Sequence, residues 1–330
     1  MSDWARVRLH VVTGKGGTGK TTVAAALAMA LARDGRKVLL CEVEGRQGIA
    51  RLFDVEPLPY EERLVAVAPG DGEVRALAID AEAALLEYLD MYYRLGRAGR
   101  ALDRFGVIDF ATTIAPGVRD VLLTGKVFEA YRRRQRAGPP VYDHIVLDAP
   151  PTGRIARFLN VNAEVAGIAK VGPIRKQADS IMQVLQSRGT AVHLVTLLED
   201  MPVQETADAI TELSAAELSI GGIVVNQARS TPLTATTRKA IATGSLGAAE
   251  LLPALKTAGL DDLSATPGTV ADGLLAGAVE HVERLDLEER LLADVEALGR
   301  PVYRLPQLSD GMDLAGLYEL ADALCEQAMA

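Results

Sequence analysis

The chain has 330 residues, 49% of them hydrophobic and 24% charged, which is enough for one large α/β domain or two smaller ones. The formal net charge of -9 argues against a nucleic-acid-binding surface, because such surfaces need clustered Lys and Arg. The two cysteines, Cys41 and Cys325, and the four histidines are scattered in the sequence, which argues against a disulfide framework or a metal cluster.

The N-terminal part of the sequence has the order strand, glycine loop, helix. An apolar strand is predicted at Arg8–Thr13, and a run of Ala and Leu from Val23 to Ala32 predicts a helix. Between them, Gly14–Thr22 matches G-x-x-x-x-G-K-[ST] in full. Successive N–H groups of such a loop point at a phosphate chain, and the helix adds the positive end of its dipole. We therefore expect a phosphate-binding loop.

The side chains of this loop have distinct expected roles. Lys20 should reach the β- and γ-phosphates of a nucleotide, and the hydroxyl of Thr21 should bind Mg²⁺. An ordinary phosphate-binding loop has no need of the earlier lysine, Lys15. The predicted nucleotide-binding residues of the loop are Gly16, Gly17, Thr18, Gly19, Lys20, Thr21 and Thr22.

The sequence predicts neither a signal peptide at the start of the chain nor a membrane-spanning helix. Residues 1–8 have no apolar signal core, and the longest apolar run falls short of the roughly 20 residues needed to span a bilayer. We expect a cytoplasmic protein, with peripheral contact to a membrane left open.

Short apolar segments alternate with helical ones along the chain, which is typical of a mostly parallel sheet with helices on both faces. The segment Ser230–Thr237, which is polar and contains Pro232, is expected to be a loop within one domain covering 1–330. The predicted strands are Arg8–Thr13, Lys37–Val43, Arg75–Ile79, Asp143–Asp148, Ala191–Leu197, Gly221–Asn226 and Val302–Leu305.

Residues 81–135 form a long helical insertion between two of these strands. Ordinary core packing explains this pattern. A lid or client-binding subdomain explains it equally well, because insertions of this size between strands are often functional. A second helical region, at 154–188, is expected to contain a client or switch region.

Glu44 follows the predicted strand Lys37–Val43. Parallel strands place their carboxyl ends at one edge of the sheet, so Glu44 should lie near the nucleotide. A carboxylate there could position or deprotonate the attacking water. The alternative is a helix N-cap or a surface charge.

Asp148 ends another apolar strand, where phosphate-loop enzymes place an aspartate that orients Mg²⁺, usually through water. The next residues, Thr152–Arg154, begin a helix and are well placed to sense the γ-phosphate. The alternative is an aspartate that only caps this helix.

Two later positions are expected near the base of the nucleotide. Asn226 closes a strand, and its amide suits an adenine edge, while Pro306 begins a loop after the last strand. The sequence lacks a guanine-reading N/T-K-x-D motif after Asn226, which favours ATP over GTP.

These motifs, in this order, resemble the ArsA family, which contains the arsenical-pump ATPases and the tail-anchored-protein targeting ATPases. Lys15–Thr22 is similar to its deviant Walker A loop, Asp148–Gly153 to its switch and Val225–Gln227 to its adenine-side segment. The resemblance covers nearly the whole chain and looks closest to actinobacterial members. It implies a P-loop fold and a nucleotide-sandwich dimer in which Lys15 reaches the partner's nucleotide. It also places Glu44 where the family has an aspartate that positions water.

The sequence departs from the family pattern in residues that bind the client or transported species and in a residue that affects the rate of ATP hydrolysis. The zinc C-x-x-C of eukaryotic targeting ATPases and the metalloid-binding cysteines of the pump ATPases are missing, and Glu44 replaces aspartate. We expect a Mg-ATP-dependent dimeric ATPase, formed by two copies or with a paralogous ATPase, that binds and releases a client such as a hydrophobic membrane-protein segment. The alternatives are the ATPase subunit of an anion-efflux pump and a nucleotide-dependent scaffold that does not hydrolyse ATP.

Overall fold

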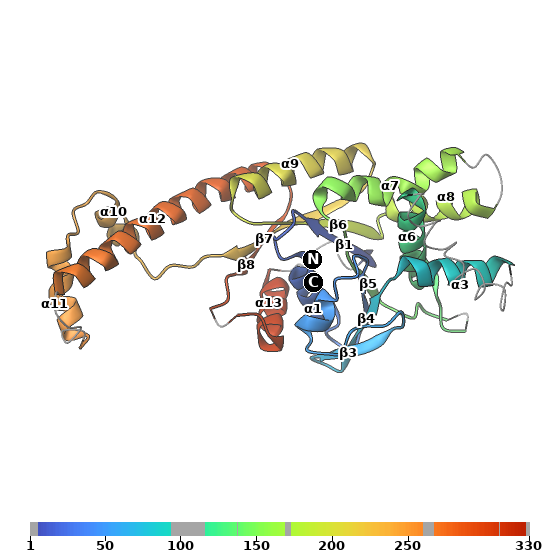
Figure 1. Cartoon of the computed structure of the whole chain (residues 1–330), viewed down its shortest axis with the longest axis horizontal. Helices are drawn as coiled ribbons and strands as arrows, with labels where there is room; N and C mark the ends of the chain where they lie inside the picture. Colours follow the sequence, from blue (N-terminus) through green and yellow to red (C-terminus); the bar gives the residue numbers. More distant parts are fainter. Residues whose placement is uncertain are drawn as a thin grey trace.

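A single mixed sheet of eight strands runs through the middle of the molecule in the computed structural model (Figure 1), which describes residues 6–93, 116–136, 138–168, 173–259, 267–309 and 311–327. The strand order is β3-β4-β2-β5-β1-β6-β7-β8, and all neighbours are parallel except β3 and β4. The strands are β1 (Leu9–Gly14), β2 (Lys37–Glu42), β3 (Arg63–Ala68), β4 (Gly72–Ala78), β5 (His144–Asp148), β6 (Thr190–Thr196), β7 (Ile220–Ala228) and β8 (Val302–Pro306). The mostly parallel α/β fold predicted from the sequence is confirmed, and each predicted strand is present within a few residues.

The antiparallel edge strand β3 was not predicted. It forms a hairpin with β4 through a turn in which Gly70 and Asp71 both have positive φ. Residues 64–68 are a continuous apolar run, so the sequence did carry a signal for this strand. Leu64 and Val67 are about half exposed, because β3 lies at the edge of the sheet. The Gly-Asp turn was the available signal for this hairpin.

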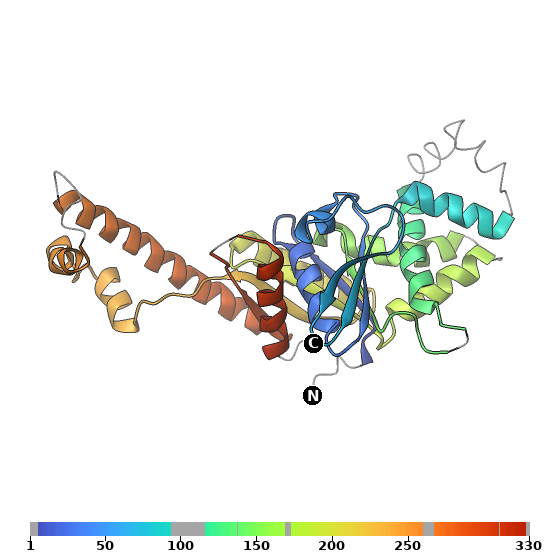
Figure 2. The same ribbon diagram turned by 90° about the horizontal axis from the view of Figure 1, so that it is seen from below.

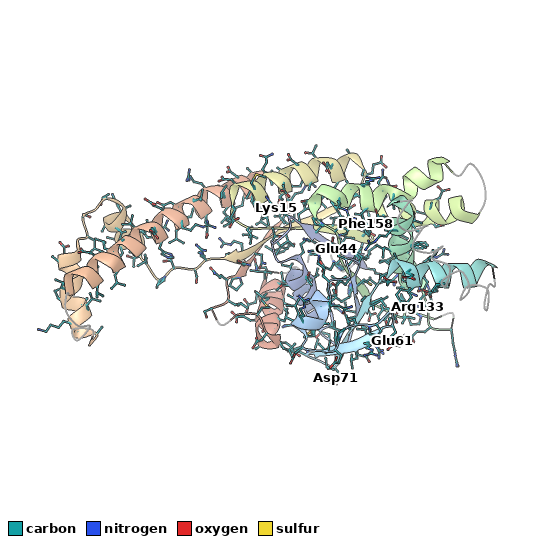
Figure 3. All side chains as sticks on the ribbon, in the orientation of Figure 1. Lys15, Glu44, Glu61, Asp71, Arg133 and Phe158 are labelled. Carbon is teal, nitrogen blue, oxygen red and sulfur yellow. The ribbon has the colours of Figure 1, made fainter. Side chains whose placement is uncertain are left out.

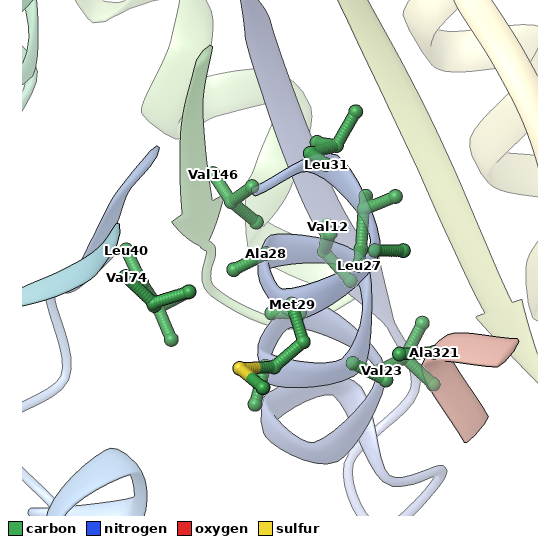
Figure 4. Packing of buried hydrophobic residues seen from close by; sticks show 14 of the residues in the cluster. Val12, Val23, Leu27, Ala28, Met29, Leu31, Leu40, Val74, Val146 and Ala321 are labelled. Carbon is green, nitrogen blue, oxygen red and sulfur yellow. The ribbon is translucent and has the colours of Figure 1, made fainter. Parts of the chain in front are cut away.

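One face of the sheet is covered by α1 (Lys20–Leu31), α13 (Leu314–Glu326) and the short α2 (Gly48–Leu52). Helix α1 packs between the sheet and α13, so its side chains from Val23 to Leu31 are all buried (Figure 4). The alanines of α1 allow this close approach on both sides. The nucleotide loop is therefore attached to the most deeply buried helix on this face.

The opposite face is covered by α6 (Pro116–Arg132), α7 (Thr152–Ile168), α8 (Pro173–Leu185) and α9 (Asp200–Ala215), with α3 (Ala81–Tyr93) packed against α6. The predicted insertion 81–135 is helical in α3 and α6, and its residues 94–115 lie outside the described residues. Of the helical region predicted at 154–188, α7 and α8 are described and 169–172 are not. Lys126 of α6 holds α3 through Glu87, at 2.8 Å.

The chain leaves the sheet after β7 and forms an arm of α10 (Ala235–Ala242), α11 (Ala248–Thr257) and the N-terminal half of α12 (Pro267–Ala297). The arm and the helical group of α3, α6 and α8 extend to opposite ends of the molecule in two perpendicular views (Figures 1 and 2). The loop prediction for Ser230–Thr237 was wrong in its last residues, because the Thr234 hydroxyl caps a helix that begins at Ala235. Within the described ranges, no helix has the length and apolar character needed to cross a membrane.

Candidate nucleotide-binding site

The loop after β1 has the backbone shape that its glycines predict. Gly17 and Gly19 have φ of 92° and 85°, a region that residues with a Cβ rarely adopt. A Cβ on Gly14 would lie 2.1 Å from the carbonyl oxygen of Val195, so this position has no room for a side chain. Gly16 and Gly17 are exposed, with open space around them. The loop thus packs closely against β6 at Gly14 and is open to solvent at Gly16 and Gly17, as a phosphate-binding loop must be.

Asn226 supports this loop from the end of β7. Its side-chain amide donates to the carbonyl of Thr18 at 2.9 Å, and a Cβ on Gly19 would lie 2.3 Å from the same nitrogen. Thr18 in turn donates its hydroxyl to the carbonyl of Lys15. This bracing role was not predicted. The expected contact of Asn226 with adenine stays a prediction, as does that of Pro306, which pairs with Ala228 on the neighbouring strand.

Thr21 and Asp148 lie together at the carboxyl ends of the central strands. The hydroxyl of Thr21 donates to Oδ2 of Asp148 at 2.7 Å, although 127 residues separate them in the sequence. Burial raises the pKa of Asp148 to about 6. A hydroxyl beside a carboxylate offers the oxygen ligands that Mg²⁺ prefers. The pair therefore fits the predicted magnesium site.

Lys20 begins α1 and is directed into the loop. Its Nζ donates to the carbonyl of Lys15 at 3.3 Å, and its residue is only 8% exposed. Burial lowers the pKa of Lys20, while Asp148 and Glu44 oppose that shift. Of the described side chains, none caps the N-terminus of α1. The first N–H groups of this helix and a desolvated ammonium group thus both suit a phosphate.

Glu44 lies just beyond β2 and does not cap a helix. Its carboxylate forms long ion pairs with Arg46 at 3.6 Å and with Arg154 of α7 at 3.9 Å. The capping role belongs instead to Glu42, which accepts from the N–H groups of Gly48 and Ile49 at the start of α2. The alternative interpretation of Glu44 as an N-cap is therefore wrong. Its carboxylate, with a side chain that is 20% exposed, stays accessible at this edge of the sheet.

Lys15 forms an ion pair with a carboxylate of α9. Its Nζ lies 3.2 Å from Oε1 of Glu205, and the hydroxyl of Thr152 donates to Oε2 of the same carboxylate at 3.0 Å. Figure 3 shows Lys15 and Glu44 in the central part of the molecule, between the arm and the opposite helical group. Sequence reasoning missed Glu205, because a helical glutamate carries no motif. It reaches the loop only because β6, which leads into α9, pairs with β1.

Three histidines that are scattered in the sequence lie together in the sheet, on the adjacent strands β5, β1 and β6. His10 Nδ1 lies 3.1 Å from His193 Nε2, and the ring centroids of His10 and His144 are 5.5 Å apart. Burial lowers the pKa of each, that of His193 to about 3, which favours the neutral form of the rings. Within the described part of the chain, no group of three or more His, Cys, Asp or Glu is arranged to hold a metal ion. These histidines are buried in the core of the sheet.

Asp148→Asn is expected to stabilise the nucleotide-free protein by about 1–3 kcal/mol at pH 7.5, because the buried carboxylate is ionised there at a cost. Since burial raises the pKa of Asp148, the folded wild type takes up its proton first as the pH falls. The difference between variant and wild type should therefore shrink from about pH 6 down to about pH 4. Urea unfolding without Mg²⁺ at several pH values measures this. A variant less stable than wild type at pH 7.5 would contradict the raised pKa of Asp148.

Comparison with known proteins gives a consistent result. Residues 7–187 match a family model described as anion-transporting ATPase. The ATPase BagA of Mycobacterium tuberculosis is 53% identical over 323 residues, covering 98% of this chain and 94% of that protein. The arsenical pump-driving ATPase of Acidiphilium multivorum is 26% identical over 328 residues, covering 93% of this chain and 53% of that protein. The ATPase GET3 of Kluyveromyces lactis is 24% identical over 250 residues, covering 66% of this chain and 70% of that protein.

Proposed function

This chain belongs to the ArsA family of anion-transporting ATPases and hydrolyses ATP, and on that premise we propose that it is a dimeric switch driven by ATP and Mg²⁺. Two protomers, either two copies or this chain with a paralogous ATPase, enclose nucleotides between them. Binding closes the dimer and hydrolysis relaxes it. The observation that carries this proposal is the contact of Lys15 with Glu205 of α9, in which both side chains are partly exposed and so within reach of a second protomer.

Within one protomer, the residues at the carboxyl ends of the strands have separate roles in binding and hydrolysing ATP. The loop Gly16–Thr22 and Lys20 bind the phosphates, because open N–H groups and a buried ammonium group replace their water shell. Thr21 and Asp148 hold Mg²⁺, which when bound neutralises phosphate charge. Glu44 positions the attacking water through its accessible carboxylate. Phosphoryl transfer needs mainly placement and charge neutralisation, and these residues supply both.

The path from the nucleotide to the helical face begins at the switch loop that follows Asp148. Thr13 of β1 donates to the carbonyl of Pro150 at 2.6 Å, and α7 begins two residues later, at Thr152. Helices α6 and α8 pack against α7. A small apolar gap lies between these three helices and β5. Its lining residues are Thr124, Val127, Phe128, Leu147, Leu159, Ile181, Val184 and Leu185.

The client of this switch is, in our proposal, a hydrophobic membrane-protein segment, bound on the helical face of α3, α6, α7 and α8 at the cytoplasmic surface of a membrane. The coupling path described above supports this, since it ends on these helices. Affinity purification of the Glu44→Gln variant from its own cells with Mg-ATP tests it. Co-purified membrane-protein segments support the proposal, whereas a protein that elutes without any client argues against it.

A second candidate is the ATPase subunit of an anion-efflux pump, favoured by the description of the family as anion-transporting ATPases and by the pump-driving relative. Against a metalloid anion, Cys41 is fully buried in the sheet, and Cys325 lies on α13, which packs on the opposite face of the sheet. Co-purification of a membrane permease with the same variant would favour this second function.

Lys15→Ala is expected to lower turnover by about 100-fold or more while changing nucleotide affinity less than about threefold, because the lysine acts on the partner's nucleotide. Steady-state ATPase assays and titration with a fluorescent ATP analogue measure the two quantities. An equal loss of affinity and turnover would place Lys15 in its own site and contradict the dimeric arrangement.

A further inference from the structure

Glu205 contacts two elements of the nucleotide site at once. One oxygen of its carboxylate pairs with Lys15 of the phosphate loop at 3.2 Å, and the other accepts the hydroxyl of Thr152, the first residue of α7, at 3.0 Å. Thr152 is buried, whereas the side chains of Lys15 and Glu205 are about one-third exposed. One carboxylate therefore links the loop that binds phosphate to the helix that follows the switch.

The position of Glu205 is fixed by the packing of α9. The neighbouring Thr206 is buried, and its hydroxyl bonds to the carbonyl of Pro202 one turn earlier. Val203 and Ala209 are also buried against the body of the protein. The backbone at Glu205 is thus fixed, and Thr152 donates to its carboxylate, while Lys15 ends in a flexible side chain. A contact between them restrains the lysine more than the glutamate.

We propose that Glu205 is a positioning residue that restrains Lys15 in the open protein and so opposes closure of the dimer. This inference rests on the proposed function, because Lys15 must leave Glu205 to reach the partner's nucleotide. The phosphates of that nucleotide compete with the carboxylate for the same ammonium group. Departure of Lys15 also leaves Thr152 as the main partner of Glu205, which lets the start of α7 respond to closure.

The size of the effect follows from the exposure of the ion pair. A partly exposed pair is worth roughly a threefold change in an equilibrium constant. Two such pairs open in a dimer of two copies of this chain, so closure of that dimer should become about tenfold more favourable without them. Apparent nucleotide affinity rises in proportion to the closed fraction while that fraction is small. Glu205→Gln should therefore lower the half-saturating ATP concentration by about five- to tenfold.

The test uses the full-length chain with Mg-ATP at one high protein concentration. Steady-state turnover gives the half-saturating ATP concentration and the saturating rate for wild type, for Glu205→Gln and for the control Glu212→Gln, an exposed glutamate on the same helix. The proposal expects a lower half-saturating concentration for Glu205→Gln, a saturating rate that changes less, and wild-type values for the control. In the Lys15→Ala background, the same substitution should leave the affinity for an ATP analogue unchanged.

The outcomes separate this inference from the proposed function. If Lys15→Ala behaves as predicted but Glu205→Gln leaves the half-saturating concentration within about twofold of wild type, the restraint is absent and the inference alone is overturned. A shift of equal size in the Lys15→Ala background would also overturn it, because Glu205 would then act through another residue. If Lys15→Ala loses affinity and turnover equally, the dimeric function fails, and this inference fails with it.

Discussion

Replacing Lys20 by alanine is expected to lower ATP turnover by about 100-fold or more and to weaken ATP binding in parallel. Lys20 is buried at the start of α1, and its ammonium group has the carbonyl of Lys15 as its hydrogen-bond acceptor. Burial lowers its pKa, so the charged group is held at a cost that a bound phosphate would offset. Without it, the cradle keeps its N–H groups but loses its main positive charge. Isothermal titration with ATP and steady-state turnover measure the two effects.

A matched control for this variant is Lys239→Ala, which removes an exposed lysine on α10, in the arm. It should leave binding and turnover at wild-type values. Thermal unfolding of both variants shows whether any loss comes from the fold. A folded Lys20→Ala protein that binds ATP normally would overturn the assignment of the phosphate site.

Glu44→Gln is expected to lower turnover by about 100-fold or more while ATP affinity stays within about threefold of wild type. Glutamine keeps the size of the side chain but removes the charge that attracts and orients a water proton. Because the ion pairs of Glu44 with Arg46 and Arg154 are long, the fold should tolerate the change. Single-turnover hydrolysis with pre-bound ATP measures the chemical step directly.

Glu319→Gln on the exposed side of α13 is the control for this change and should hydrolyse ATP at the wild-type rate. Normal single-turnover hydrolysis by Glu44→Gln would move the water-positioning role to another residue. Glu44→Asp adds a second comparison, because it restores the charge one methylene further back. Its rate shows whether the length of the side chain sets the speed of hydrolysis.

The parts of the site that sequence analysis predicted are those encoded by local pattern. Gly14–Thr22 forms the phosphate loop because glycines at fixed spacing permit its positive φ values and its close approach to β6. Asp148 meets Thr21 because both follow neighbouring parallel strands, whose carboxyl ends share one edge of the sheet. Strand ends and loop motifs therefore suffice to predict these contacts.

The parts that sequence analysis missed depend on which strands become neighbours. Asn226 braces Thr18, and Glu205 reaches Lys15, because β6 lies next to β1 in the sheet and β7 lies next to β6. The sequence alone does not specify that order. For the same reason, the sequence did not predict that the three buried histidines lie together. The arm was missed because its helices have ordinary amphipathic patterns, which do not tell whether a helix packs on the sheet or projects from it.

The most direct test of the dimeric account mixes two inactive variants. Lys15→Ala and Glu44→Gln chains carrying different tags are combined, and mixed dimers are isolated through both tags. In such a dimer, the Lys15→Ala protomer keeps its own Glu44 and receives Lys15 from its partner, so one of the two sites is complete. The account predicts that mixed dimers recover about half of the wild-type ATPase rate. Isolated mixed dimers that hydrolyse ATP no faster than either parent would contradict it.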